Sequence, residues 1–158
     1  MKIREATYQD STAISALAIA LSKKYITPEF PASVAQSFLS SLTPEVIENN
    51  MRNGLRYHVA ESKNQIIGLI GIKHESHLYH LFVNEAYQKR GIARQLWHIA
   101  RDTCIAVGNN DGFTVNSSRY AQEFYEKLGF VTRSDPVERN GVVAIPMKLT
   151  FDPLNITD

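Results

Sequence analysis

The stretch from Phe82 to Trp97, FVNEAYQKRGIARQLW, decides the fold of this chain of 158 residues. It joins the end of an apolar run to a polar loop that holds Arg90 and Gly91, and a helical pattern begins directly after the loop. A helix N-terminus presents unpaired backbone N–H groups and the positive end of the helix dipole at one point. We therefore expect an anionic group to bind here.

Two other kinds of anion-binding loop are excluded by their spacing. A phosphate-binding P-loop needs G-x-x-x-x-G-K-[ST], a string that the chain does not contain. A dinucleotide-binding loop needs G-x-G-x-x-G, whereas the segment QKRGIA, residues 88–93, has one glycine. For this loop taken alone, an ordinary turn with solvated Lys89 and Arg90 stays open as the alternative.

The composition is that of an ordinary soluble protein, with 44% apolar and 21% charged residues. The length suits one domain, so we interpret residues 1–158 as a single domain. The net charge is +1, from 17 basic and 16 acidic residues, so no overall field recruits nucleic acid or a membrane as a partner. The opening MKIREATYQD lacks the apolar run of a signal peptide, and no window approaches the roughly 18 apolar residues of a membrane span. We expect a cytoplasmic protein.

The single cysteine, Cys104, excludes an internal disulfide and a thiol-rich metal site, and we expect no metal. Its helical spacing from Trp97 and Ala100 predicts a small core residue rather than a nucleophile.

Periodicity and turn residues predict a mixed α/β fold with helices on both faces of the sheet. The expected order is strand, helix, helix, three strands, helix, strand, helix and two final strands. Residues 43–54 form the best-marked helix, with Thr43 as its cap and Gly54 as its end. Two prolines, Pro28 and Pro31, predict a loop over residues 25–37.

Two spaced motifs carry a resemblance to a known family. The segment QKRGIA fits the pattern Q/R-x-x-G-x-G/A, and SSRYAQEFYEKLGF, residues 117–130, is similar to N-x-x-A-x-x-hydrophobic-Y-x-x-x-G-F. With the order of elements, the chain resembles the GNAT-superfamily N-acetyltransferases. The resemblance implies an acetyl-CoA-dependent acyltransferase with a mixed, mostly antiparallel sheet of about seven strands.

The resemblance also implies where coenzyme A would bind: backbone amides of the loop hold its pyrophosphate, and a strand splayed by a β-bulge pairs with its pantetheine amides. Ala93 stands where a second glycine is more usual, and Ser118 stands where many members have Asn, so that Asn116 is a substitute candidate. The implied cofactor-binding residues are Leu81, Phe82, Val83, Gln88, Lys89, Arg90, Gly91, Ile92, Ala93, Arg94, Asn116, Ser118 and Tyr125.

Transfer of an acetyl group to an amine requires an amine without its extra proton, a stabilised oxyanion and a proton for the leaving thiolate. By resemblance, Tyr125 faces the cofactor sulfur and is the proton donor. A merely structural role for Tyr125, as a core aromatic residue, is the alternative.

The strand HLYHLFV, residues 77–83, resembles a strand of the arylalkylamine N-acetyltransferases in which a histidine at the place of His77 assists amine deprotonation. A half-buried His77 that is hydrogen-bonded across the sheet is the alternative. Period-two alternation predicts that His77 shares a face with Tyr79, Leu81 and Val83, opposite the face of His80.

The acceptor is expected to be a small-molecule amine, such as a polyamine, an amino sugar or an arylalkylamine. Glu29 and Glu138 are candidates to attract its ammonium group. A peptide or protein amine is the second choice, and a non-catalytic acyl-CoA-binding sensor is the alternative from another functional class. Members of the family often form homodimers, but no segment of this sequence identifies an interface.

Overall fold

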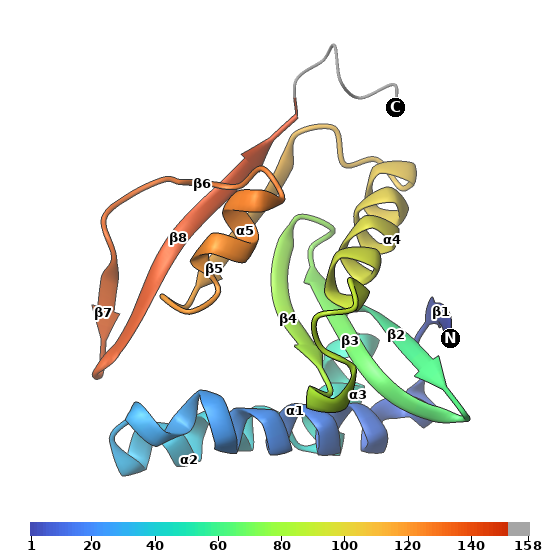
Figure 1. The fold of residues 1–158 in the computed structure, drawn as a ribbon, viewed down its shortest axis with the longest axis horizontal. Helices are drawn as coiled ribbons and strands as arrows, with labels where there is room; N and C mark the ends of the chain where they lie inside the picture. Colours follow the sequence, from blue (N-terminus) through green and yellow to red (C-terminus); the bar gives the residue numbers. More distant parts are fainter. Residues whose placement is uncertain (152–158) are drawn as a thin grey trace.

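The structure, a computed structural model, describes residues 1–151 (Figure 1). The strands are β1 (Lys2–Glu5), β2 (Arg56–Ser62), β3 (Gln65–Lys73), β4 (His77–Val83), β5 (Gly112–Ser117), β6 (Val131–Thr132), β7 (Val137–Arg139) and β8 (Val142–Thr150). The helices of this part of the chain are α1 (Ser11–Tyr25), α2 (Ala32–Ser40), α3 (Pro44–Arg52), α4 (Ile92–Ala106) and α5 (Gln122–Lys127).

The strands form one mixed sheet in the order β1-β2-β3-β4-β5-β8-β6, with β7 also paired to β8. The β4–β5 pair is parallel, and the other strand pairs are antiparallel. This confirms the expected fold class. The strand count is eight rather than about seven, because residues 133–136, which end in Pro136, separate β6 from β7. Proline has no N–H for a sheet ladder and interrupts the strand.

The N-terminal half has one more helix than the sequence indicated. The predicted loop over residues 25–37 contains a short 3₁₀ helix at Thr27–Glu29 and the first part of α2. Pro31 is the residue before α2, where a fixed φ and a missing N–H are tolerated. The predicted cap of α3 is confirmed, since Thr43 Oγ1 accepts from the Val46 N–H at 3.4 Å.

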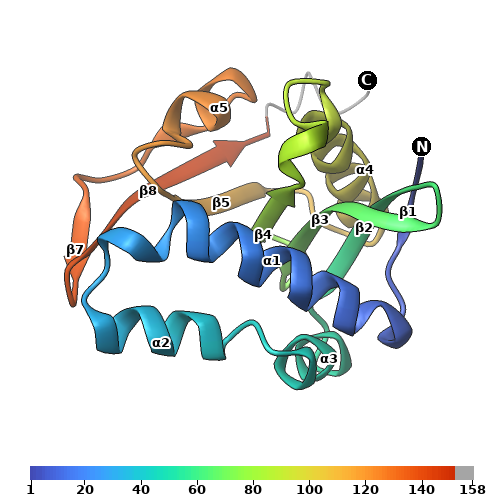
Figure 2. The ribbon, with the colours of Figure 1, turned by 60° about the horizontal axis from the view of Figure 1, so that its bottom comes forward.

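The sheet separates two apolar cores. On one face, α1 contacts α3, β3 and β4 (Figure 2), and Ile14, Leu42 and Ile47 are fully buried there. On the other face, α4 and α5 cover a larger core. Its centre is Trp97, whose ring lies 4.9 Å from that of Phe113. Helices therefore cover both faces of the sheet, as predicted.

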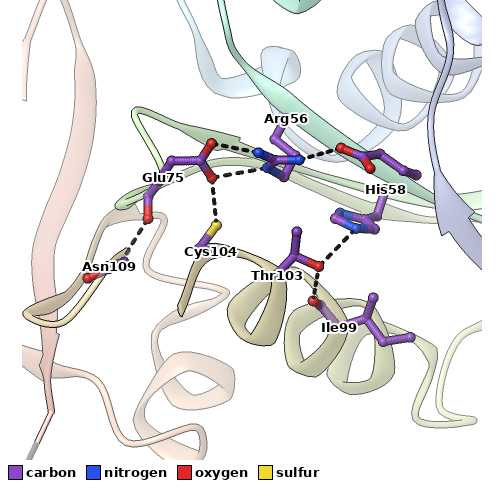
Figure 3. Close-up of polar contacts among 8 residues, drawn as sticks. Arg56, His58, Glu75, Ile99, Thr103, Cys104 and Asn109 are labelled. Carbon is purple, nitrogen blue, oxygen red and sulfur yellow. Dashed lines mark hydrogen bonds and ion pairs between the residues drawn. The ribbon is translucent and has the colours of Figure 1, made fainter. Parts of the chain in front are cut away.

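A polar network fastens the far end of α4 to the sheet (Figure 3). The Arg56 guanidinium binds both oxygens of Glu75, at 3.0 and 2.9 Å. The Cys104 thiol, which is fully buried as predicted, donates to Glu75 Oε2 at 3.2 Å. Asn109 Nδ2 donates to the Glu75 carbonyl at 2.9 Å, so α4, β2 and the β3–β4 turn are held together.

Among residues 1–151, no helix is both long and apolar enough to cross a membrane.

Candidate active site

A β-bulge in β4 shapes the centre of the sheet. Gly71 of β3 pairs with His80, and Ile72 pairs with Leu78, so Tyr79 is an extra residue between them. An extra residue bends its strand and disrupts the ladder locally. The bulge implied by the family resemblance is therefore present.

The bulge also changes which side chains share a face of the sheet. The prediction that His77 lies on the face of Leu81 and Val83 is wrong. Leu78 packs with Leu81 and Val83 in the core under α4, so His77 lies on the opposite face, the face of His80. Regular alternation holds only for an unbroken strand, and the extra residue inverts it for everything before Tyr79.

Strands β4 and β5 separate beyond the bulge, as Figure 1 shows. Their described pairing is limited to His77 with Thr114 and Leu78 with Val115. From there the backbones of the two strands diverge toward their carboxyl ends, and we call this separation of the two backbones the opening. This opening ends at the loop before α4.

The backbone of β4 presents polar groups to this opening. The Asn84 N–H donates to the Ile67 carbonyl of β3 at 2.8 Å. Backbone N–H and C=O groups of successive residues point to opposite edges of a strand. The backbone groups of Phe82 and His80 therefore also point toward β3, and those of Leu81 and Val83 point toward the opening. Leu81 and Val83 can therefore pair with a ligand backbone, but Phe82, named with them, faces the wrong way for that.

The loop between β4 and α4 is held in shape by its own side chains. Asn84 Oδ1 accepts from the Ala86 N–H at 2.9 Å and starts a short 3₁₀ helix at Glu85–Tyr87. Gln88 Nε2 donates to the Val83 carbonyl at 2.8 Å. The Gln88 side chain thus ties the loop to the strand that it follows.

The start of α4 has the backbone features expected of an anion-binding site, and we call it the anion cradle. Gly91, with φ 78°, is the N-cap residue of α4, and without a side chain it leaves the first N–H groups of the helix uncapped. The left-handed backbone of Gly91 favours glycine, and a Cβ there would meet no atom within 4 Å, so the preference for glycine comes from backbone conformation and not from space. The first N–H groups of α4 point into the loop without an intrahelical partner. These N–H groups could hold an anion such as a pyrophosphate.

The cationic side chains of the loop lie at its exposed rim. Lys89, Arg90 and Arg94 are exposed, and Lys89 also has a left-handed backbone, with φ 63°. The Arg90 guanidinium lies 5.3 Å from the centre of the Tyr87 ring, which restrains it. Ile92 is buried and Ala93 half-buried, so these two residues can offer only backbone N–H groups to an anion.

The second motif begins at the end of β5, on the other side of the opening. Asn116 is exposed there. Ser118 Oγ accepts from the Ala121 N–H at 3.1 Å and so stabilises the turn into α5. Its hydroxyl proton stays available to a ligand. The family resemblance implied only a cofactor role for Ser118, and the turn is a second task that a serine performs well.

Tyr125 lies in the core under α4 and α5 with 6% of its surface exposed. Its ring contacts Phe124 and Phe130 edge to face, at 5.3 and 5.6 Å. Burial raises the pKa of Tyr125 well above its ordinary value, so its hydroxyl keeps its proton. The side chain therefore has the surroundings of a core aromatic residue and the protonation state of a proton donor.

His77 is half-buried, and its Nδ1 lies 2.7 Å from Thr114 Oγ1 across the β4–β5 pair. Burial is the main cause that lowers the pKa of His77, and the charges of Lys73 and Arg133 lower it further. The ring is neutral near pH 7. The Thr114 contact holds one ring nitrogen and leaves Nε2 for a second partner.

A second histidine lies close by on the same face. His80 Nδ1 lies 2.9 Å from the Tyr57 hydroxyl, and burial lowers the pKa of His80 to about 4. The exposed Tyr79 ring lies 4.3 Å from the His80 ring and beneath the Lys73 ammonium. His80 and Tyr57 are buried structural partners, and Tyr79 is the residue that faces solvent.

Three contributors escaped the sequence analysis. Asn84 after a strand is a recognisable cap signal, so its role could have been found. Thr114 is the partner of His77, and Lys24 reaches from α1 to Glu85 at 2.8 Å. These last two depend on strand order and helix placement, which no local pattern states. Lys24 and Glu85 border an open depression between α1 and the loop.

Comparison with solved structures supports the fold over the whole described chain. The PaiA N-acetyltransferase from Thermoplasma acidophilum, in complex with coenzyme A, has a TM-score of 0.78 and 17% identity, covering 95% of this chain and 98% of that one. A GNAT-family acetyltransferase from Staphylococcus aureus Mu50 has a TM-score of 0.73 and 21% identity, covering 96% and 99%. The ribosomal-protein-alanine N-acetyltransferase from Brucella melitensis has a TM-score of 0.69 and 17% identity, covering 96% and 100%.

Sequence comparison supplies the family. No curated protein matches the chain. A family model described as an acetyltransferase (GNAT) domain matches residues 17–151. This range includes the loop before α4, the splayed strands and the second motif. The chain therefore belongs to the GNAT acetyltransferase family and is an acyltransferase.

Proposed function

We propose that this enzyme transfers an acetyl group from acetyl-CoA to the primary amine of a small molecule, by direct attack of the amine on the thioester. The observation that carries the proposal is the opening between β4 and β5, which leads from the anion cradle at Gly91 to the point where His77 meets Thr114. A long, anionic cofactor with a reactive far end fits such an opening.

The cofactor would be held from the loop inward. The N–H groups at the start of α4 and the rim cations Arg90 and Arg94 would bind the pyrophosphate. Leu81 and Val83 would pair through their backbones with the pantetheine amides, and Asn116 and Ser118 border the opening from β5. When bound, the cofactor supplies the activated acetyl group.

Two side chains would move the protons. His77, neutral near pH 7, would accept a proton from the acceptor amine at Nε2, directly or through water, while Thr114 orients the ring. Bond formation between nitrogen and the acetyl carbon breaks the carbon–sulfur bond. Tyr125 would then give its hydroxyl proton to the departing thiolate, and its raised pKa keeps that proton available.

A small acceptor is supported by the rim of the site. The turn between β7 and β8 reaches the start of α2 (Figure 2), and a Cβ at Gly141 would come within 3.1 Å of Pro31. This contact would restrict access from one end to the face on which His77 lies. A closed rim suits a small molecule better than a continuous polypeptide, which needs an open path on both sides.

The test is a calorimetric titration of acetyl-CoA, followed by thiol release from acetyl-CoA with a panel of small amines. We expect binding and amine-dependent thiol release. Binding without release for any amine would favour a sensor or a protein acceptor. Absence of binding by the folded enzyme would contradict the proposal.

A further inference from the structure

Four side chains form a transverse row across the middle of the sheet. Lys73 pairs with His77, His77 pairs with Thr114, and Thr114 pairs with Lys148 on four neighbouring strands. Residues directly opposite one another in paired strands point to the same face. We call Lys73, His77, Thr114 and Lys148 the basic row.

The basic row points away from the core under α4. The residues beside it along the strands are apolar and belong to that core: Ile72, Leu78, Phe113, Val115, Met147 and Leu149. The row therefore faces the other side of the sheet, where Lys73 and Lys148 are exposed and His77 and Thr114 are half-buried. His77 and Thr114, which lie where β4 and β5 meet, are therefore partly accessible to solvent between two exposed lysines.

The charges that act on His77 in the basic row are positive. The charged groups that act on the pKa of His77 are Lys73, Arg133 and His74, and all of them lower it. The Arg133 N–H donates to the Pro146 carbonyl, and Val131 is the residue paired with Lys148, so Arg133 lies two residues along the chain from the partner of Lys148 and on the same face. Glu75 lies next to His74 in the chain but binds Arg56 and Cys104 instead.

These positions point to a substrate class, and the step rests on the proposed function. We propose that the acceptor amine carries an anionic group, a carboxylate or a phosphate, and that Lys73 and Lys148 of the basic row bind it beside His77. Lysine ammonium groups form charge-assisted hydrogen bonds with either anion. The same field opposes a second cationic group, so polyamines, which were among the small-molecule amines expected from the sequence, are poor acceptors.

The row also assists the chemistry of an anionic acceptor. Nearby positive charge disfavours an ammonium and so lowers the pKa of an amine held beside it. The anion of the acceptor compensates the row in binding, while the amine itself still lies among cations. With a lower pKa, the acceptor amine gives its proton to His77 more readily at the start of the reaction.

Matched bisubstrate conjugates test the proposal whichever amine is the natural acceptor. Coenzyme A is joined through an S–CH₂–CO bridge to glycine, to phosphoethanolamine, to glycinamide or to ethylenediamine. The cofactor part is identical, so differences in affinity report on the acceptor side alone. We expect the glycine or the phosphoethanolamine conjugate to bind at least about tenfold more tightly than the glycinamide conjugate, as for a hydrogen-bonded charge pair. The stronger of the two identifies the anion.

Variants assign the preference to the basic row. Lys148→Gln and Lys73→Gln should each reduce the affinity ratio of the anionic conjugate to the glycinamide conjugate to less than about threefold, while unmodified coenzyme A binds as before. Lys2→Gln, an exposed lysine on the edge strand β1, is the matched control and should leave the preference unchanged.

The outcomes separate the two proposals. Equal binding of all four conjugates, or tightest binding of the ethylenediamine conjugate, would overturn the basic row while leaving acetyl transfer intact. A preference that survives both lysine substitutions would also overturn it. Failure of coenzyme A itself to bind would instead contradict the proposed function.

Discussion

Substitutions of Gly91 separate backbone strain from charge at the anion cradle. Any residue with a Cβ at φ 78° carries a conformational penalty of roughly 1–2 kcal/mol. For a chain of this size, that penalty lowers the melting temperature by about 2–8 °C. A Cβ at Gly91 meets no atom within 4 Å, so no steric cost is added. Gly91→Ala should therefore fold and bind acetyl-CoA with little loss of affinity.

Gly91→Glu adds a negative charge to the same backbone cost. With a carboxylate about 6 Å from a bound phosphate and an effective dielectric constant of about 40, repulsion amounts to about 1.4 kcal/mol. This corresponds to about tenfold weaker binding. Gly91→Gln has almost the same shape and no charge, so the Glu-to-Gln ratio isolates the electrostatic effect.

The assay is calorimetric titration of acetyl-CoA into each variant at low and high salt. The Glu-to-Gln ratio of dissociation constants should be about ten at low salt and should fall toward one as salt rises, because salt screens exposed charges. Gly108→Glu is the control, because Gly108 also has a left-handed backbone, with φ 116° and open space, but follows the other end of α4. Equal affinities of Gly91→Glu and Gly91→Gln at low salt would refute the cradle.

The remaining predictions concern the two residues proposed to transfer protons, acid stability and the buried thiol. Tyr125→Phe should lower the turnover number by about 100-fold or more and leave coenzyme A affinity within about twofold, measured by thiol release and calorimetry; equal losses in both would indicate a packing role. His77→Gln should remove the acidic limb of the pH–rate profile below about pH 6.5, and an unchanged limb would assign it to another group. The pKa of His80 is about 4 in the folded protein, against about 6.5 in the unfolded chain. Below about pH 6.5 the unfolded chain therefore binds more protons, and the free energy of unfolding decreases as the pH falls, by about 2 kcal/mol at pH 5. In urea unfolding, the free energy of unfolding of His80→Asn should decrease by about 2 kcal/mol less over the same pH range. Burial raises the pKa of Cys104 to about 12, so a thiol reagent should modify it only on unfolding, and rapid labelling of the folded enzyme would contradict this placement.

The parts of the site that sequence predicted best depend on local backbone chemistry. A glycine before a helix and an apolar strand before a polar loop can each be recognised from a few neighbouring residues. The structure accordingly has Val83 at the end of β4 and Gly91 directly before α4, as the sequence indicated.

The parts that sequence missed depend on partners far along the chain. The bulge at Tyr79 is defined by the register of β3 against β4, so a pattern within β4 alone predicted the wrong face for His77. The basic row joins four strands whose order includes the non-sequential β5–β8 pair. Helix α2 was hidden because prolines suggested a loop, although Pro31 stands where a helix begins.

Because of the bulge, the geometry of this site depends on the number of residues in β4 more than on which side chain stands at position 79. Replacing Tyr79 by another residue keeps two positions of β4 opposite one step of β3, and His77 stays on its face. Removing Tyr79 restores regular pairing and turns over everything before it: His77 would enter the apolar core under α4, and Leu78 would enter solvent. A one-residue deletion would thus put a leucine where His77, the proposed proton acceptor, lies, so this part of β4 should tolerate substitution better than a change in length.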